Sequence, residues 1–163
     1  MSQDPRQELR VTSLSEPISH YTDAVRFGDL LFVSGLAALD SSGQLVGRGD
    51  VVAQTRQIFT NFKTVLDAAG ADFSDVLKVT VFLIDVRDRT EINPVRQEFF
   101  GNARPASTLV GVKELALPGM LVEIEAVVGL DTTESRHHPS QIDRAVAGRS
   151  IAPEKEKARV APS

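Results

Sequence analysis

The segment from Val51 to Ala69 constrains the fold more than any other part of the sequence. Its apolar residues recur at three- and four-residue steps, which predicts an amphipathic helix with one apolar stripe. The stripe consists of Ile58, Phe59, Phe62, Val65, Leu66 and Ala69. Asp50 is suited to cap the start of this helix, and Gly70 is suited to end it. A stripe of this length must be buried. Because most of the remaining periodic segments are predicted strands, we expect the helix to pack against a sheet.

The other periodic segments predict five strands and a second helix. The strands are Ala24–Phe27 and Leu30–Ser34, joined by a tight turn at Gly28, then Val76–Ile84, Ala106–Val112 and Met120–Val128. The second helix presents Ile92, Val95, Phe99 and Phe100 on one side and ends at Gly101. Asn93 before Pro94 is typical of a helix cap followed by the first helical residue. This order predicts an α+β fold, a single sheet with two helices packed on one face.

Two helices cannot cover both faces of such a sheet. The run Leu30-Leu31-Phe32-Val33 is apolar on both faces, so we expect that strand to be covered on both sides. An exposed apolar sheet face would aggregate, and we therefore expect the chain to form oligomers through it.

Composition divides the chain into three parts. We expect an N-terminal arm at residues 1–16, a domain at residues 17–130 and a tail at residues 131–163, either extended or packed on a neighbouring subunit. The tail holds a Glu154–Lys157 charge run and isolated apolar residues, too few to offset the entropy of ordering it.

Composition also excludes several kinds of site. The absence of cysteine excludes disulfides, thiolate metal ligands and cysteine nucleophiles, and agrees with a cytoplasmic location. A net charge of -4 with scattered cations disfavours nucleic acid as a partner. No apolar run predicts a membrane span or a secretory signal. The glycines lack the spacing of a dinucleotide site, and His20 and His137-His138 lack partners for catalysis or metal binding, so we expect no cofactor and no metal.

The last strand carries the most informative polar residues. Period-two alternation places Glu123 and Glu125 on one face, which either meets solvent or holds a carboxylate in a partly dry cleft. Such a carboxylate would have a raised pKa and could position a water molecule or move a proton. Ser34-Gly35 and Ser107-Thr108 could offer hydroxyl and backbone N–H groups to a ligand, although both pairs are also ordinary residues for a strand end.

An ordered set of segments resembles the YjgF/RidA family of imine and enamine deaminases. The matching stretches are Tyr21–Val25, Leu31–Gly35, Asn61–Lys63 leading to Leu66–Gly70, Lys78–Leu83, Asn93 with Phe99-Phe100, Arg104–Thr108 and Val122–Ala126. The resemblance covers about residues 17 to 130. It implies a mixed sheet of chorismate-mutase-like topology and a homotrimer with three clefts, each lined by two subunits. It also implies a small-molecule substrate, such as 2-aminoacrylate, that is hydrolysed to a keto acid and ammonia.

Carried over to this chain, the resemblance makes Glu123 the residue that places the water. Tyr21, Ser34 and Asn93 match cleft positions of the family, and we add Gly35 and Thr108, from the two pairs named above, as candidate substrate-binding residues. The family's substrate-clamping arginine, two residues after the proline of a Pro-Ala-Arg-Ser run, corresponds to Ser107. A serine hydroxyl provides one neutral hydrogen bond where a guanidinium provides a bidentate clamp.

The missing arginine leaves two classes of function open. The chain is either a deaminase with altered substrate specificity or a non-catalytic trimer that binds a small molecule. Endoribonuclease activity, sometimes attributed to relatives, is a third reading that the acidic composition disfavours. Arg104, three residues before Ser107, could substitute as the cation that binds substrate, and Lys113 is a more distant candidate.

Overall fold

The predicted amphipathic segment forms α1 (Val51–Ala69) in a computed structural model, which describes residues 5–131. The Asp50 carboxylate accepts a hydrogen bond from the Ala53 N–H at 2.9 Å and caps the first turn. Gly70 ends the helix in the left-handed region, at a φ of 71°, where glycine is favoured. Both helix signals in the sequence are thus confirmed.

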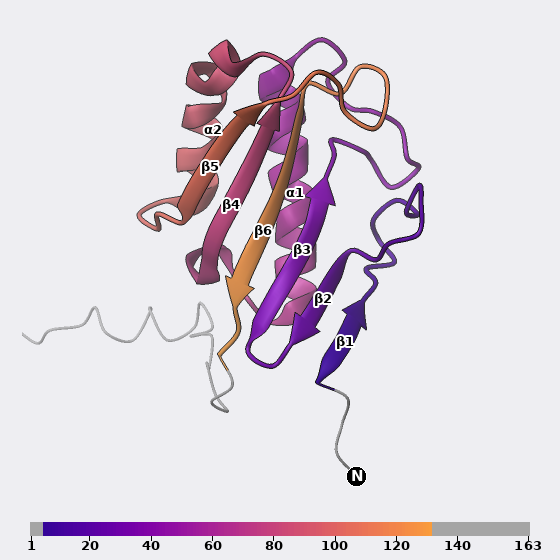
Figure 1. The fold of residues 1–163 in the computed structure, drawn as a ribbon, viewed down its shortest axis with the longest axis vertical. Helices are drawn as coiled ribbons and strands as arrows, with labels where there is room; N and C mark the ends of the chain where they lie inside the picture. The colour runs from indigo at the N-terminus through magenta and orange to yellow at the C-terminus, as the bar shows by residue number, and fades with distance from the viewer. Residues whose placement is uncertain (1–4, 132–163) are drawn as a thin grey trace, which may run out of the picture. The chain divides into compact units, whose positions relative to one another are not determined.

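Six strands form one mixed sheet in the order β1-β2-β3-β6-β4-β5, and all neighbouring pairs are antiparallel except β4 and β5 (Figure 1). The strands are β1 (Arg6–Leu9), β2 (Ala24–Phe27), β3 (Leu30–Leu36), β4 (Val76–Leu83), β5 (Ala106–Gly111) and β6 (Val122–Gly129). Short 3-10 helices at Phe73–Asp75 and Val86–Asp88 precede β4 and α2 (Arg89–Phe100), respectively. The α+β fold with a single sheet is confirmed.

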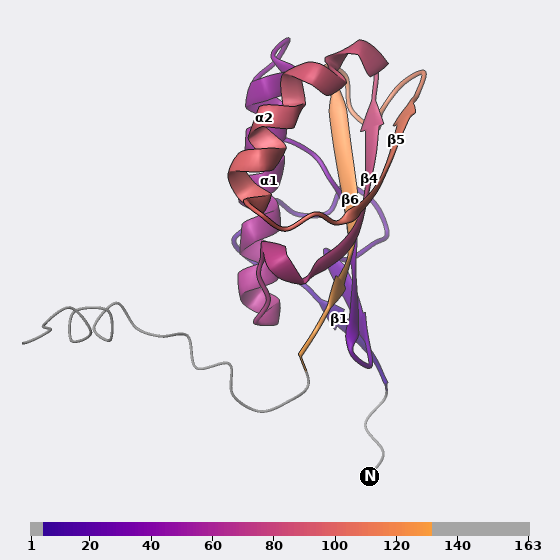
Figure 2. The same cartoon turned by 90° about the vertical axis from the view of Figure 1, so that its left-hand side faces the viewer.

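Both helices lie on the same face of the sheet, as Figure 2 shows. The core lies between the two helices and the sheet, where the α1 residues Ile58, Phe59 and Phe62 are at most 2% exposed. Alternate residues of the central strands, such as Val81 and Ile124, are fully buried against this layer.

The opposite face of the sheet stays open in the single chain. Leu31 and Val33 are buried against the helices, whereas Phe32 between them is 46% exposed. The expectation that this strand is covered on both sides concerns an assembly of subunits, since neither helix reaches that face (Figure 2), and it stays a prediction.

Two further differences from the sequence analysis concern the ends of elements. Arg6–Leu9, which we assigned to an arm, forms β1 and pairs with β2 at the sheet edge. Asn93 is not a helix cap, because α2 begins at Arg89 after Asp88 and contains Pro94 in its interior. Proline cannot donate to the carbonyl of Thr90, but both residues are on the exposed side of α2, where solvent can bond that carbonyl.

The proposed tail lies outside the described residues except for Asp131, as do His137 and His138. Within residues 5–131, no helix has the length and apolar character needed to cross a membrane.

Candidate functional site

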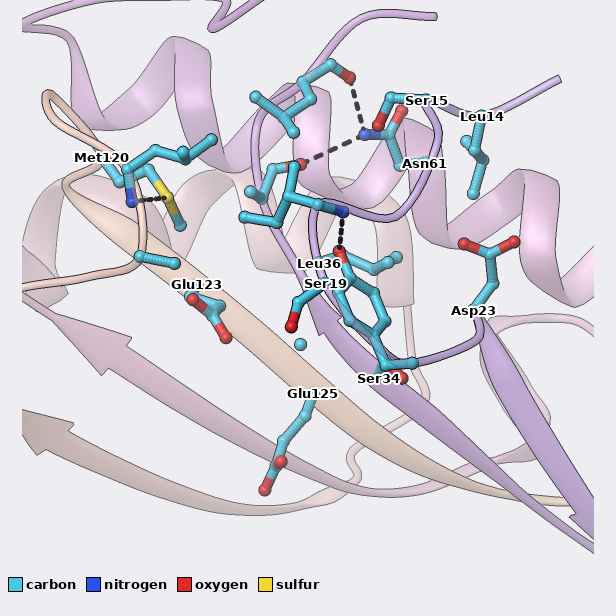
Figure 3. Close-up of a pocket in the computed structure, with 17 residues that line it drawn as sticks. Leu14, Ser15, Ser19, Asp23, Ser34, Leu36, Asn61, Met120, Glu123 and Glu125 are labelled. Carbon is cyan, nitrogen blue, oxygen red and sulfur yellow. Dashed lines mark hydrogen bonds between the residues drawn. The ribbon is translucent and has the colours of Figure 1, made fainter. Parts of the chain in front are cut away.

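Glu123 lies in the floor of a cavity of about 480 Å³ at one end of the open sheet face. Glu123 and Glu125, both on β6, line the cavity, and in Figure 3 the Glu125 carboxylate points away from the other labelled side chains. The strand register places them opposite Phe82 and Thr80 of β4, so the predicted shared face is confirmed. Glu125 is the more exposed of the two carboxylates.

Burial raises the pKa of Glu123 above its ordinary value, and the nearby charge of Glu125 raises it further. Both effects disfavour the ionised form of Glu123, since one removes water from the carboxylate and the other adds a like charge. A half-buried carboxyl group of this kind is suited to exchange a proton with a reacting molecule.

Gly35 lets the Glu123 carboxylate lie directly against β3. The register of β3 with β6 shifts between Val33 and Leu36, which leaves Ser34 and Gly35 in an irregular stretch. A Cβ atom at Gly35 would lie 2.1 Å from Glu123 Oε1, so no larger residue fits beside the carboxylate in this position.

Tyr21 and Ser34 line the same cavity as Glu123. The Ser34 hydroxyl donates to the Thr22 carbonyl at 2.7 Å, and so it faces a ligand as a hydrogen-bond acceptor. The Tyr21 hydroxyl oxygen accepts a long bond of 3.4 Å from the Ile18 N–H and keeps its own proton available for donation.

Three buried polar side chains hold the walls of the cavity. Asp23 accepts hydrogen bonds from Arg10 Nη1 and the Val11 N–H, both at 2.7 Å, and so fixes the segment before β2. Asn61 donates to the carbonyls of Ala37 and Leu39, which follow β3 (Figure 3). Gln54, which is fully buried, bonds the loop before β6 by donating to the Gly119 carbonyl and accepting from the Leu121 N–H.

The remaining predicted site residues do not line this cavity. Asn93 is on α2, Arg104 precedes β5, and Ser107 and Thr108 are on β5. All four are exposed, and so is Lys113. The Ser107 hydroxyl accepts a hydrogen bond from Arg96 Nη2 at 3.0 Å, and Thr108 Oγ1 lies 3.0 Å from Lys78 Nζ. A single chain therefore separates the predicted site into a Glu123 part and a β5 part.

Among the described residues, no three histidine or carboxylate side chains are grouped so that they could hold a metal ion. His20 is an exposed residue of the segment before β2 and does not line the cavity. The cavity lining, which comes wholly from residues 14–125, includes no lysine or arginine. Its charged side chains are all carboxylates, those of Asp23, Glu123 and Glu125.

Comparison with known proteins places this chain in a family. A family model described as Endoribonuclease L-PSP matches residues 12–129. This chain belongs to the YjgF/RidA family. The predicted family is thereby confirmed, whereas the individual site residues remain predictions.

Relatives of known name agree with this assignment. A RutC family protein of Pyrococcus horikoshii is 40% identical over 112 residues, which make up 69% of this chain and 88% of that protein. The 2-iminobutanoate/2-iminopropanoate deaminase of Mus musculus is 39% identical over 129 residues, 78% of this chain and 93% of that enzyme. Among solved structures, RidA of the Antarctic bacterium Psychrobacter superposes with a TM-score of 0.71 at 30% identity, covering 76% of this chain and 99% of RidA.

The close approach of Gly35 to Glu123 gives a testable expectation for this YjgF/RidA chain. In Gly35→Ala, the new methyl group must push the flexible Glu123 side chain away, while the sheet backbone stays in place. If the Glu123 carboxylate acts on the substrate, its displacement by about 1 Å lowers the rate of catalysis roughly 10²-fold. The steady-state rate at which the variant hydrolyses an imine substrate measures this effect.

Gly129→Ala is the matched control, because the atoms nearest to a Cβ there belong to the Leu77 side chain and lie at ordinary contact distances of 3.4 Å and more. We expect this variant to keep the wild-type rate. Equal rates for Gly35→Ala and Gly129→Ala would show that the position of Glu123 does not matter.

Proposed function

We propose that this chain is a hydrolytic deaminase that converts a small imine or enamine to a carbonyl compound and ammonia. The observation that carries the proposal is the half-buried Glu123 carboxyl group with a raised pKa, in a cavity that also presents Tyr21 and Ser34. The deaminase named among the relatives supports the same reaction class.

In the proposed reaction, Glu123 accepts a proton from a water molecule as the water oxygen bonds to the imine carbon. The C=N double bond becomes a single bond as Glu123 passes this proton to the nitrogen, which gives the neutral carbinolamine. In the collapse of the carbinolamine, Glu123 accepts the hydroxyl proton as C=O forms. The C–N bond breaks, and Glu123 passes that proton to the nitrogen, which leaves as ammonia. One water is consumed for each ammonia released, and no redox partner is needed.

We further propose that the active form is a homotrimer in which the β5 edge of one subunit completes the cavity of its neighbour. The exposed Phe32 and Val110 on the open sheet face support an interface there, since apolar side chains of this size gain from burial. This arrangement would bring Asn93, Arg104, Ser107 and Thr108 to the Glu123 part of the site. Sedimentation of the full chain tests it, with three times the 17.7 kDa chain mass as the expected result.

Ser107 supports an altered substrate specificity. A serine hydroxyl in place of a guanidinium weakens the binding of a carboxylate by about 2–4 kcal/mol, because a charge-assisted clamp is lost. We therefore propose that the chain handles 2-aminoacrylate poorly and prefers a substrate that is held differently.

The test is hydrolysis of a set of imines that an amino-acid oxidase generates in the assay. We expect release of keto acid above the spontaneous rate for at least one imine. We also expect the imine with the highest kcat/KM to be one other than 2-iminopropanoate. Binding of the keto-acid products without accelerated hydrolysis of any imine would instead support a non-catalytic binding trimer. The acidic lining of the cavity disfavours ribonuclease activity, since a phosphate backbone would meet carboxylates there.

The raised pKa of Glu123 predicts the pH dependence of the reaction. Because Glu123 must be ionised to accept a proton, we expect kcat/KM to rise with pH, with its midpoint above the ordinary glutamate value of 4.5. In Glu125→Gln, the like charge is removed, and the midpoint should move to lower pH. An identical pH–rate profile for the wild type and Glu125→Gln would mean that the ionisation of Glu123 does not limit the rate at low pH.

A further inference from the structure

Arg96 places a guanidinium beside Ser107, the β5 position at which the family has its substrate-clamping arginine. Arg96 is in the middle of α2, and its Nη2 donates to Ser107 Oγ at 3.0 Å. The parallel β4-α2-β5 connection brings these residues together, although they are eleven positions apart in sequence. A cation is thus present at Ser107, supplied from the helix layer.

No carboxylate within residues 5–131 forms an ion pair with Arg96. The side chain is partly buried, and this burial alone lowers its pKa, since removal of water disfavours the charged form. Burying a guanidinium without an anion costs free energy that a bound anion would recover. The other arginines of α2 and its surroundings differ, because Arg87 pairs with Asp85, and Arg89 and Arg104 are exposed.

The geometry around Arg96 also provides a second donor. Since the Ser107 oxygen accepts from Arg96, the hydroxyl proton of Ser107 is free to donate to a ligand. The guanidinium has further N–H groups in the planar fork that fits a carboxylate. Lys78 contacts the neighbouring Thr108 hydroxyl, but an ammonium group has no such fork.

We propose that Arg96 is the anion anchor of this site, and that its guanidinium, oriented by Ser107, binds a carboxylate of the substrate. The inference rests on the proposed function, in which the β5 edge of one subunit meets the Glu123 cavity of the next. It narrows the substrate class to imines or enamines that carry an acidic group.

The test compares the binding of 2-oxobutanoate and of uncharged 2-oxobutanamide, by calorimetric titration of the full-length protein. Arg96→Gln should weaken 2-oxobutanoate binding about 10- to 100-fold, while the affinity for the amide changes less than about threefold. Arg89→Gln on the same helix is the matched control, since Arg89 is exposed and belongs to neither part of the site. It should bind both compounds as the wild type does.

Three results would overturn the assignment of Arg96. They are no binding of 2-oxobutanoate by the wild type, equal binding by Arg96→Gln, and a loss of binding in Arg104→Gln in place of Arg96→Gln. If Arg96→Gln changes the assembly state, Arg96→Lys serves instead. It keeps the charge without the fork, and we expect binding about 3- to 10-fold weaker, with unchanged affinity counting against the proposal.

The same proteins distinguish this inference from the proposed function. Carboxylate binding that depends on Arg96, with no accelerated hydrolysis of any imine, would support the anchor and overturn the deaminase. Accelerated hydrolysis with an affinity for 2-oxobutanoate that is independent of Arg96 would support the deaminase and overturn the anchor.

Discussion

Glu123→Gln is expected to lower the rate of imine hydrolysis by about 10²- to 10⁴-fold, the usual contribution of a general base. Glutamine has almost the same shape and can still accept a hydrogen bond from water, but it cannot take up the proton. Steady-state release of ammonia from the preferred imine measures the loss. An unchanged rate would make Glu123 a structural residue only.

The stability of the same variant provides its control. The pKa of Glu123 is raised in the folded chain, so the folded state holds more protons than the unfolded state between the ordinary and the raised pKa. The free energy of unfolding therefore falls as pH rises through this range, and Glu123→Gln removes that loss. We expect thermal melting at pH 7 to show a variant at least as stable as the wild type, with lost activity.

Ser107→Arg is expected to raise the turnover of 2-aminoacrylate about 10²- to 10³-fold, because a bidentate clamp strengthens carboxylate binding in the transition state. The change is best made together with Arg96→Gln. Nη2 of Arg96 lies 3.0 Å from the Ser107 hydroxyl oxygen. In Ser107→Arg alone, the guanidinium groups at positions 96 and 107 would therefore repel each other as like charges, which the double variant avoids.

Arg96→Gln alone is the matched control for this double variant, and it should hydrolyse 2-aminoacrylate no faster than the wild type. Wild-type turnover already equal to that of the double variant would mean that Ser107 does not limit the substrate range. Both proteins should sediment as the wild type does.

The sequence was sufficient to predict the helices and strands whose signals are local. The apolar stripe and the caps at Asp50 and Gly70 define α1, and period-two alternation in β6 puts Glu123 and Glu125 on one face. By contrast, β1 has no apolar period, because its residues Arg6–Leu9 are held at the sheet edge by backbone pairing with β2. The family resemblance supplied those candidate site positions that no spacing indicates, and they stay predictions.

The features missed are those that arise through space. Asn93-Pro94 has the composition of a helix start, but the chain enters α2 directly from the 3-10 turn at Val86–Asp88. The contact of Gly35 with Glu123 depends on the shifted register between β3 and β6, and that of Arg96 with Ser107 depends on the path of α2 over β5. Neither contact leaves a periodic pattern in the sequence.

The position of β6 has a consequence for synthesis in the cell. Of the strands within residues 5–131, β6 is the last to be translated, yet it lies between β3 and β4 and joins the β1-β2-β3 and β4-β5 groups into one sheet. Until residues 122–129 leave the ribosome, each group has an unpaired inner edge that can join a wrong partner. A nascent chain arrested before Val122 would therefore be prone to aggregate, and completion of the sheet must wait for nearly the whole domain.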